Sequence, residues 1–303
     1  MQTGSLRRGL TRALRRRIAP WFETGAWRHP TWPARSIDRL VVSFPKSGRT
    51  WLRVLLAGVE AERTRQPLEK VAADWLRRDA PELAGRPVLF THALASSHGE
   101  PLQHVAVFLS YVADRARVFL VRDPRDAVVS YYFQQVKRRG GDWGDVPDGL
   151  SAFARHPFYG VDRIVGLLNA SQRAFESGSG PALIVSYEAL HAEPVVSLAR
   201  VLRFLGAGEV AVPVLERAVE FARFDNMRKL EERGALSGRL RPADPNDPES
   251  FKTRKGRVGG YREYFDGEDV AWIESRIQNG LVAAMGYATP GAAPAIAERA
   301  ARP

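Results

Sequence analysis

The sequence predicts an α/β domain of three layers (α/β/α), in which helices cover both faces of a mostly parallel central sheet. Four apolar runs have the length of strands, and each is continuous rather than alternating, as expected of strands buried on both faces. Helix-like segments lie between these runs, which favours strands joined by crossover helices. The expected strands are 40–44, 87–91, 116–121 and 182–187, and the expected helices are 50–62, 68–78, 125–138, 161–177 and 194–205.

The composition is that of a globular protein. The chain has 303 residues, of which 45% are hydrophobic, enough for one large domain or two small ones. The absence of cysteine excludes disulfides and thiolate metal sites. No apolar run approaches the roughly 20 residues of a membrane span, and no secretory signal follows the first basic residues. We therefore expect a cytoplasmic protein, with peripheral membrane contact left open.

The positive charge is concentrated at the N-terminus. The net charge is +11, and the first 39 residues hold nine arginines against Glu23 and Asp38. We expect residues 1–36 to form a basic arm, with an amphipathic pattern. Three interpretations stay open: packing on the body of the protein, contact with an anionic membrane or acidic partner, and nucleic-acid binding. No nucleic-acid motif accompanies the arm, so nucleic acid is not an expected partner.

The other boundaries follow from composition. Residues 37–288 are the expected catalytic domain, and 289–303 form an Ala/Pro-rich tail that we expect to fray. A Pro/Asp-rich stretch at 234–249 has the length of a lid or a disordered loop.

The stretch FPKSGRTW (44–51) stands at a strand-to-helix turn. Backbone N–H groups at a helix N-terminus attract anions, and Gly48 lets the backbone approach one closely. Lys46 adds a positive charge, and Ser47 and Thr50 add hydroxyl donors. The turn is P-loop-like but lacks the Walker A spacing. It predicts a phosphate-binding site, with an ordinary tight turn as the alternative.

Two later stretches carry similar chemistry. In VFLVRDPRDAVVSYYF (118–133), Arg122 ends a strand and Ser130 follows on the next helix, so both side chains are candidates for a second anion. The alternative is that Arg122 pairs with Asp126. In FKTRKGRVGGYREYF (251–265), Arg254, Lys255 and Gly256 are candidates for wrapping a phosphate, with a solvated basic loop as the alternative.

These three stretches, in this order, resemble the sulfotransferases that use 3′-phosphoadenosine 5′-phosphosulfate (PAPS). FPKSGRTW is similar to Y-P-K-S-G-T-T-W, the interval from Arg122 to Ser130 fits R-x-P-x-D-x-x-x-S, and the RKGRVGGY run resembles R-K-G-x-x-G-D-W. The resemblance spans roughly residues 40–287. It implies PAPS as co-substrate, adenosine 3′,5′-bisphosphate as product, and no metal.

The resemblance also implies a role for each stretch. The first turn, Lys46 to Trp51 and including Arg49, would cradle the 5′-phosphosulfate. Arg122, Ser130 and the Arg254–Gly256 run would hold the 3′-phosphate. The aromatic residues Trp51, Tyr187 and Phe224 match positions around adenine, with core packing as the alternative. Lys46 would offset charge on the leaving group, and Ser130 would hold Lys46 until both substrates are bound.

The chain departs from the family pattern at several positions. Arg49 stands where the first signature often has threonine, and Gly260 and Tyr261 replace Asp-Trp. Phe251 lies three residues before Arg254 rather than two. Phe90 replaces the family's lysine two residues before the catalytic histidine.

Three histidines are candidates for the general base. His92 directly follows a strand, and ligands gather at the carboxyl ends of strands in such sheets. It also fits the family's K-T-H pattern, so it is our choice. His98 lies in a Ser/Gly turn, and His104 precedes a helix-like run.

The sequence thus predicts an enzyme that transfers a sulfuryl group from PAPS to a hydroxyl or amine acceptor. The alternatives are a P-loop-like kinase or NTPase, and a non-catalytic basic binding protein of the same fold. The expected acceptor is a small molecule, glycan or lipid, and the sequence does not name it. It leaves a homodimer open as well.

Overall fold

A computed structural model describes residues 37–93, 102–138, 146–236, 240–289, 292, 294 and 296–302. The predicted N-terminal arm and His98 lie outside these residues. The central sheet has the strand order β4-β1-β5-β6-β7. Its strands are β1 (Arg39–Ser43), β4 (Leu89–Thr91), β5 (Ala116–Val121), β6 (Ala182–Ser186) and β7 (Ala297–Arg299).

The first four strands in this order pair in parallel, which confirms the predicted sheet. Val41 pairs with Val118, and Val118 pairs with Leu183. β7 adds an antiparallel edge beside β6, with Ala297 opposite Ile184. The segment expected to fray therefore adds a strand to the sheet. The reason is that the chain turns back along the exposed edge of β6, which offers unpaired backbone groups.

Side chains alternate between the two faces of the sheet, and helices cover both. Val41, Val118 and Leu183 face one apolar core, and Leu40, Phe119 and Ile184 face the other. The first core is covered by α2 (Arg49–Thr64), α3 (Leu68–Arg77), α8 (Tyr187–Ala192), α9 (Pro194–Phe204), α10 (Val212–Phe221) and α11 (Phe224–Glu232). The second is covered by α4 (Leu102–Tyr111), α5 (Pro124–Phe133), α6 (Leu150–Arg155), α7 (Val161–Ser177) and α12 (Gly267–Gly280).

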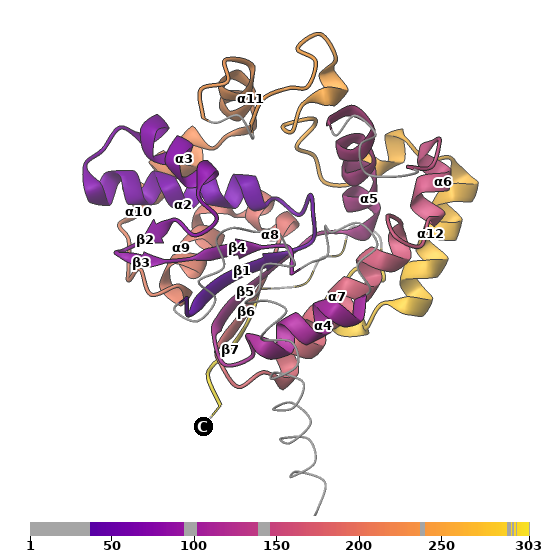
Figure 1. Cartoon of the computed structure of the whole chain (residues 1–303), viewed down its shortest axis with the longest axis horizontal. Coiled ribbons are helices and arrows are strands. Elements are labelled where there is room, and N and C mark those ends of the chain that lie inside the picture. The colour runs from indigo at the N-terminus through magenta and orange to yellow at the C-terminus, as the bar shows by residue number, and fades with distance from the viewer. Residues whose placement is uncertain are drawn as a thin grey trace, which may run out of the picture.

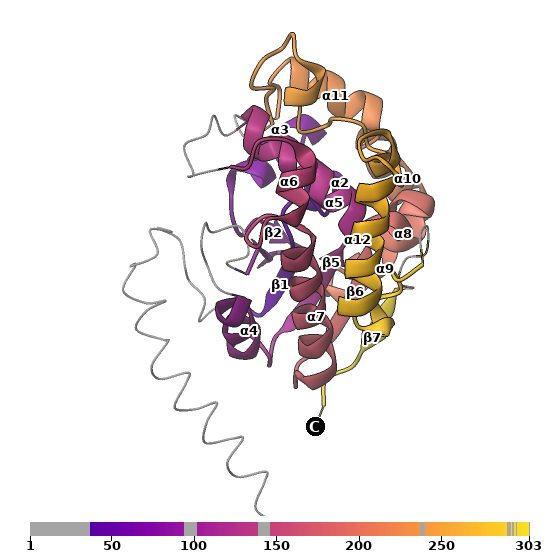
Figure 2. The same ribbon diagram turned by 90° about the vertical axis from the view of Figure 1, so that its right-hand side faces the viewer.

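Figure 1 shows the two helical layers on either side of the sheet, and Figure 2 shows α12 alongside α7 in the second layer. Both views place α11 and the segment that follows it at one end of the molecule. The short elements are β2 (Glu82–Leu83) and β3 (Arg86–Pro87), which pair with each other, and three 3-10 turns at Pro248–Ser250, Gly260–Glu263 and Ala283–Met285. Among the described helices, none is long and apolar enough to cross a membrane.

Two predicted elements are interrupted. The expected strand 87–91 divides at Val88, whose N–H donates to the carbonyl of Pro81 at 2.9 Å and so leaves the ladder. The expected helix 125–138 ends as an α-helix at Phe133 and continues as a π-helix, Gln134–Arg138. Such wider turns occur often at functional sites, and this one borders the cavity described next.

Candidate active site

A cavity of about 950 Å³ lies where the three motif stretches meet. Every residue that the sequence predicts for the site lines it, except Ser47, which is buried within the turn. The lining members of the predicted set are Lys46, Gly48, Arg49, Thr50, Trp51, His92, Arg122, Ser130, Tyr187, Phe224, Arg254, Lys255 and Gly256.

The backbone of the first turn is held in an uncommon conformation. Lys46 has φ 72°, a value that few residues other than glycine adopt. Gly48 has φ 91°, and a Cβ there would lie 2.7 Å from Cδ2 of Tyr187. Gly48 is also the N-cap of α2 and provides no side-chain cap. The N–H groups of the first turn of α2 are thus left for an anion.

The ammonium of Lys46 points to α5. Its Nζ donates to Oε1 of Gln134 at 3.3 Å. This partner lies one helical turn after Ser130, where the π-helix begins, and the role of Ser130 in holding Lys46 stays a prediction. Burial, followed by the nearby cations Lys252, Arg138, Arg122 and Arg254, holds the pKa of Lys46 well below its usual value. An anion bound here would stabilise the charged form of Lys46 and raise its pKa again.

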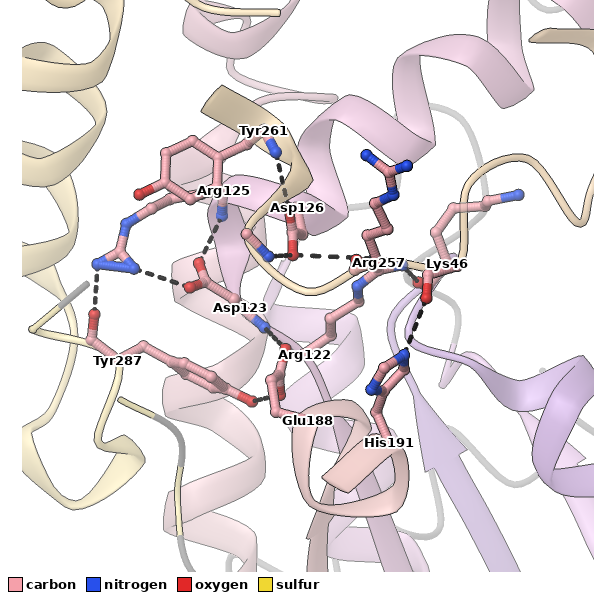
Figure 3. Close-up of polar contacts among 12 residues, drawn as sticks. Lys46, Arg122, Asp123, Arg125, Asp126, Glu188, His191, Arg257, Tyr261 and Tyr287 are labelled. Carbon is pink, nitrogen blue, oxygen red and sulfur yellow. Dashed lines mark hydrogen bonds and ion pairs between the residues drawn. The ribbon is translucent and has the colours of Figure 1, made fainter. Parts of the chain in front are cut away.

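Arg122 connects the three stretches. Its guanidinium donates to the carbonyl of Lys46 at 3.0 Å and to the carbonyl of Arg257 at 3.3 Å. It also stacks on the ring of Tyr187, 4.2 Å from the ring centroid. Figure 3 shows Arg122 beside Lys46 and Arg257. The alternative pairing of Arg122 with Asp126 is present only at 3.9 Å.

Asp126 instead anchors the third stretch. Its carboxylate accepts hydrogen bonds from the N–H groups of Gly259 at 2.7 Å and Tyr261 at 2.9 Å (Figure 3). These bonds fix the RKGRVGGY run against α5, although it lies more than a hundred residues away in sequence.

A buried network lies behind Arg122 (Figure 3). Asp123 caps α5 through the N–H of Arg125 and pairs with its guanidinium at 2.8 Å. Glu188 accepts from the N–H of Asp123 at 3.0 Å and from the hydroxyl of Tyr287 at 2.8 Å. Burial raises the pKa of Glu188 and of Asp123. The network ties the ends of β5 and β6 together beneath the cavity.

Aromatic rings form one wall. The indole of Trp51 packs edge-on to Tyr187 at 5.6 Å between centroids and donates its Nε1–H to the carbonyl of Ala222 at 2.9 Å. Phe224 keeps 38% of its surface exposed. A Cβ on Gly256, which has φ 62°, would lie 2.3 Å from the ring of Phe224. Nε2–H of His191 donates to the carbonyl of Gly256 at 3.0 Å, because a carbonyl oxygen only accepts, and this bond closes the wall.

Three cations of the third stretch, Arg254, Lys255 and Arg257, are paired with carboxylates. Arg254 contacts Glu249 at 2.9 Å, and Arg257 contacts Glu263 at 3.0 Å. Lys255 also pairs with Glu263. The side chains expected to wrap a phosphate therefore have acidic partners in this structure, and a bound phosphate would compete for them.

The candidate base, His92, is oriented by the strand beside it. Its Nδ1 lies 2.8 Å from the carbonyl oxygen of Ser43. Since a carbonyl only accepts, Nδ1 carries the hydrogen, and Nε2 is the basic nitrogen of the neutral ring. His104 lies in the first turn of α4 and is not among the cavity-lining residues. Among the described residues, no three His, Asp or Glu side chains converge as metal ligands.

Sequence reasoning missed several residues that shape the site. Gln134 follows Ser130 by four positions, the spacing of neighbours on a helix, so its proximity to Lys46 could have been inferred. Lys252 lies inside the third basic stretch but outside the family pattern. No sequence signal marks Glu231, which is fully buried and accepts hydrogen bonds from the backbone N–H groups of Lys252 and Thr253.

Comparisons with known proteins identify relatives of this chain. Cytosolic sulfotransferase 17 of Arabidopsis thaliana is 28% identical over 273 residues, covering 81% of this chain and 74% of the relative. Flavonol 3-sulfotransferase of Flaveria bidentis is 25% identical and covers 83% of this chain and 84% of the relative.

A solved structure of retinol dehydratase in complex with androsterone and the inactive cofactor PAP has the same fold. The TM-score is 0.55 at 19% identity, and the match covers 80% of each chain. A sequence model of the family described as "Sulfotransferase domain" matches residues 36–286. The chain therefore belongs to the sulfotransferase family.

Proposed function

We propose that this chain transfers the sulfuryl group of PAPS to a hydroxyl or amine acceptor by in-line displacement. The observation that carries the proposal is one cavity in which the Lys46 turn, the Arg122–Ser130 pair and the Arg254–Gly256 run meet an aromatic wall. The family membership and the PAP named in solved structures of the same fold support it. No feature of the described site favours the alternative function, a P-loop-like kinase or NTPase.

The donor is expected to lie along this arrangement. The N-terminus of α2 and Lys46 would hold the 5′-phosphosulfate, because the first-turn N–H groups of α2 have no side-chain cap. Arg122, Ser130 and the Arg254–Gly256 run would hold the 3′-phosphate. Adenine would lie between Trp51 and Phe224 and against Tyr187.

The reaction needs a general base for the acceptor hydroxyl and a cation that offsets the negative charge of the leaving group. Nε2 of His92 takes the proton of the acceptor hydroxyl, and the acceptor oxygen attacks sulfur. The bond from sulfur to the 5′-phosphate oxygen breaks, and adenosine 3′,5′-bisphosphate leaves with the negative charge. Lys46 offsets that charge as it develops, which is where a positioned cation contributes most. The chemistry requires no metal ion.

The acceptor is expected to be a small hydroxyl compound, since one relative is named for a flavonol. We keep glycans and lipids as alternative acceptors.

The relatives named as cytosolic support a cytoplasmic location. The division into an arm (1–36), a catalytic domain (37–288) and a tail remains our proposal. Membrane contact through the arm and a homodimer remain predictions.

Calorimetry with nucleotides tests the donor assignment. Adenosine 3′,5′-bisphosphate should bind without metal and about 100-fold more tightly than AMP, because AMP leaves the cations around Arg122 without their anion. ATP with Mg²⁺ serves as the kinase control. Equal affinity for adenosine 3′,5′-bisphosphate and AMP would contradict the proposal, and tighter binding of ATP with Mg²⁺ would favour the kinase alternative. Transfer of labelled sulfate from PAPS across an acceptor panel then tests catalysis.

A further inference from the structure

The cavity contains a second ammonium group, that of Lys252, which the donor assignment does not use. Within the part of the chain that the structure describes, the only hydrogen bond recorded for Lys252 is made by its backbone N–H. Its ammonium has no hydrogen bond and no ion pair there. The other lysine of the inner cavity, Lys46, at least donates to Gln134.

The buried carboxylate of Glu231 fixes the backbone around Lys252. One oxygen of Glu231 accepts the N–H of Lys252 at 2.7 Å, and the other accepts the N–H of Thr253 at 2.8 Å. Arg138 pairs with the same carboxylate at 3.2 Å. Glu231 is thus occupied by other donors, and it positions Lys252 without neutralising its ammonium.

The charges around Lys252 are mostly of the same sign. Burial, followed by Arg49 and Arg138, lowers the pKa of Lys252 to about 7, while Glu231 opposes the shift and Arg53 adds to it. Lys252 is in turn the first of the cations that lower the pKa of Lys46. Asp79 and Asp126 are the acidic residues among the described lining of the cavity, and Asp126 is engaged by the third stretch. This part of the cavity therefore favours a bound anion.

Arg49 indicates which substrate brings that anion. Its guanidinium donates to the carbonyl of Phe90 at 3.5 Å, two residues before the candidate base His92. Arg49 is also the charged group that affects Lys252 most. The aromatic wall lies in the other direction along the third stretch, where Gly256 meets Phe224. The charged group with the largest effect on Lys252 thus lies on the side of the cavity that holds Phe90 and His92.

We propose that Lys252, supported by Arg49, forms an anion-binding subsite for the acceptor. The acceptor would then be a hydroxyl compound that also carries an acidic group, such as a carboxylate. This inference rests on the proposed function, because it assigns the donor to the remaining cations of the cavity. It moves Arg49 from the cradle of the 5′-phosphosulfate, where the sequence resemblance places it, to the acceptor.

Matched acceptor pairs test this inference in the protein saturated with adenosine 3′,5′-bisphosphate. The acids are 4-hydroxybenzoate, 4-hydroxyphenylacetate and 3-(4-hydroxyphenyl)propionate, which place the carboxylate at increasing distance from the hydroxyl. Each is compared with its primary amide by calorimetry and, with PAPS, by turnover. For at least one pair, the dissociation constant of the acid should be about tenfold lower, or more, than that of its amide. This is the effect expected of one charge-assisted hydrogen bond.

Variants assign the preference to Lys252. Lys252→Met should reduce the preference for the acid to within about twofold, and Lys252→Arg should retain most of it. Affinity for adenosine 3′,5′-bisphosphate should change by less than about threefold in both variants, since the donor is held elsewhere. The control is Lys229→Met, an exposed lysine of α11 that does not line the cavity, and it should keep the full preference.

Three results would overturn the inference. The first is that no acid binds the parent better than its amide, including the case in which none binds. The second is that Lys252→Met keeps the preference. The third is that Lys252→Met lowers turnover of acid and amide alike, which would place Lys252 on the donor. Failure of the proposed function would look different, because adenosine 3′,5′-bisphosphate would then not bind and PAPS would not be consumed.

Discussion

Oδ1 of Asp126 lies 2.9 Å from the backbone nitrogen of Tyr261, and the carboxylate's other oxygen holds Gly259. The bond depends on the backbone of residue 261 and not on its side chain. Replacement of Asp-Trp by Gly260 and Tyr261 therefore leaves the anchor of the third stretch intact. The ring of Tyr261 itself is buried in the second core.

Asp126→Asn should weaken binding of adenosine 3′,5′-bisphosphate by about tenfold, because an amide has one oxygen to accept from two N–H groups. Calorimetry measures the effect. Asp162→Asn is the control, since Asp162 pairs with Arg276 on the exposed surface at 2.8 Å and should leave affinity unchanged. Unchanged affinity in Asp126→Asn would show that the third stretch does not need this anchor.

Lys46→Ala should lower kcat by about 10²-fold or more while raising the KM for PAPS much less. The reason is that its charge acts mainly on the leaving oxygen. Steady-state kinetics at saturating acceptor separate the two constants. Normal kcat with a raised KM would make Lys46 a binding residue only.

His92→Ala should lose about 10²–10⁴-fold in turnover on a hydroxyl acceptor and should still bind adenosine 3′,5′-bisphosphate. His104→Ala is the matched control, since His104 does not line the cavity. It should remain within about threefold of the parent. If His92→Ala turns over normally, the base lies elsewhere.

Lys252 should make the stability of the ligand-free protein depend on pH. Its folded pKa is lowered to about 7, whereas an unfolded lysine titrates near about 10.4. Between these values the unfolded chain binds more protons, so the contribution of Lys252 to stability becomes less favourable as pH falls and is fully unfavourable below about 7.

Lys252→Met should therefore raise the Tm of the ligand-free protein, and by more at about pH 7 than at about pH 9. The neighbours Lys46, Arg49, Arg53, Arg138 and Glu231 are present in both proteins. Loss of Lys252 also raises the pKa of Lys46, which adds to the difference in the same direction. Thermal unfolding of both proteins, with Lys229→Met as control, measures it. An equal shift at both pH values would contradict the lowered pKa.

Hydrogen exchange should slow in residues 240–260 when adenosine 3′,5′-bisphosphate binds. Arg254 now pairs with Glu249, and a 3′-phosphate would give this segment additional partners near Arg122. Mass spectrometry of the free and saturated protein compares the rates. Identical exchange in both states would show that the segment does not act as a lid.

The sequence predicted the sheet well, because continuous apolar runs such as 116–121 are typical of strands covered on both faces. It predicted the motif residues because charge, hydroxyl and glycine chemistry at strand ends is local. The partners were not predictable in the same way. Glu231 under Lys252 and Asp126 under Tyr261 are contacts between distant segments, and nothing local distinguishes these carboxylates from surface acids. The edge strand β7 was missed because its residues resemble those of a loop.

The conformation of Lys46 has a consequence for protein engineering. A lysine at φ 72°, with its ammonium surrounded by cations, is unfavourable in the resting protein on both counts. Glycine at this position would relieve the strain and remove the repulsion. A selection for heat resistance alone would thus drive residue 46 towards glycine and discard the ammonium that we propose for catalysis, so stabilising this enzyme calls for a screen that also demands turnover.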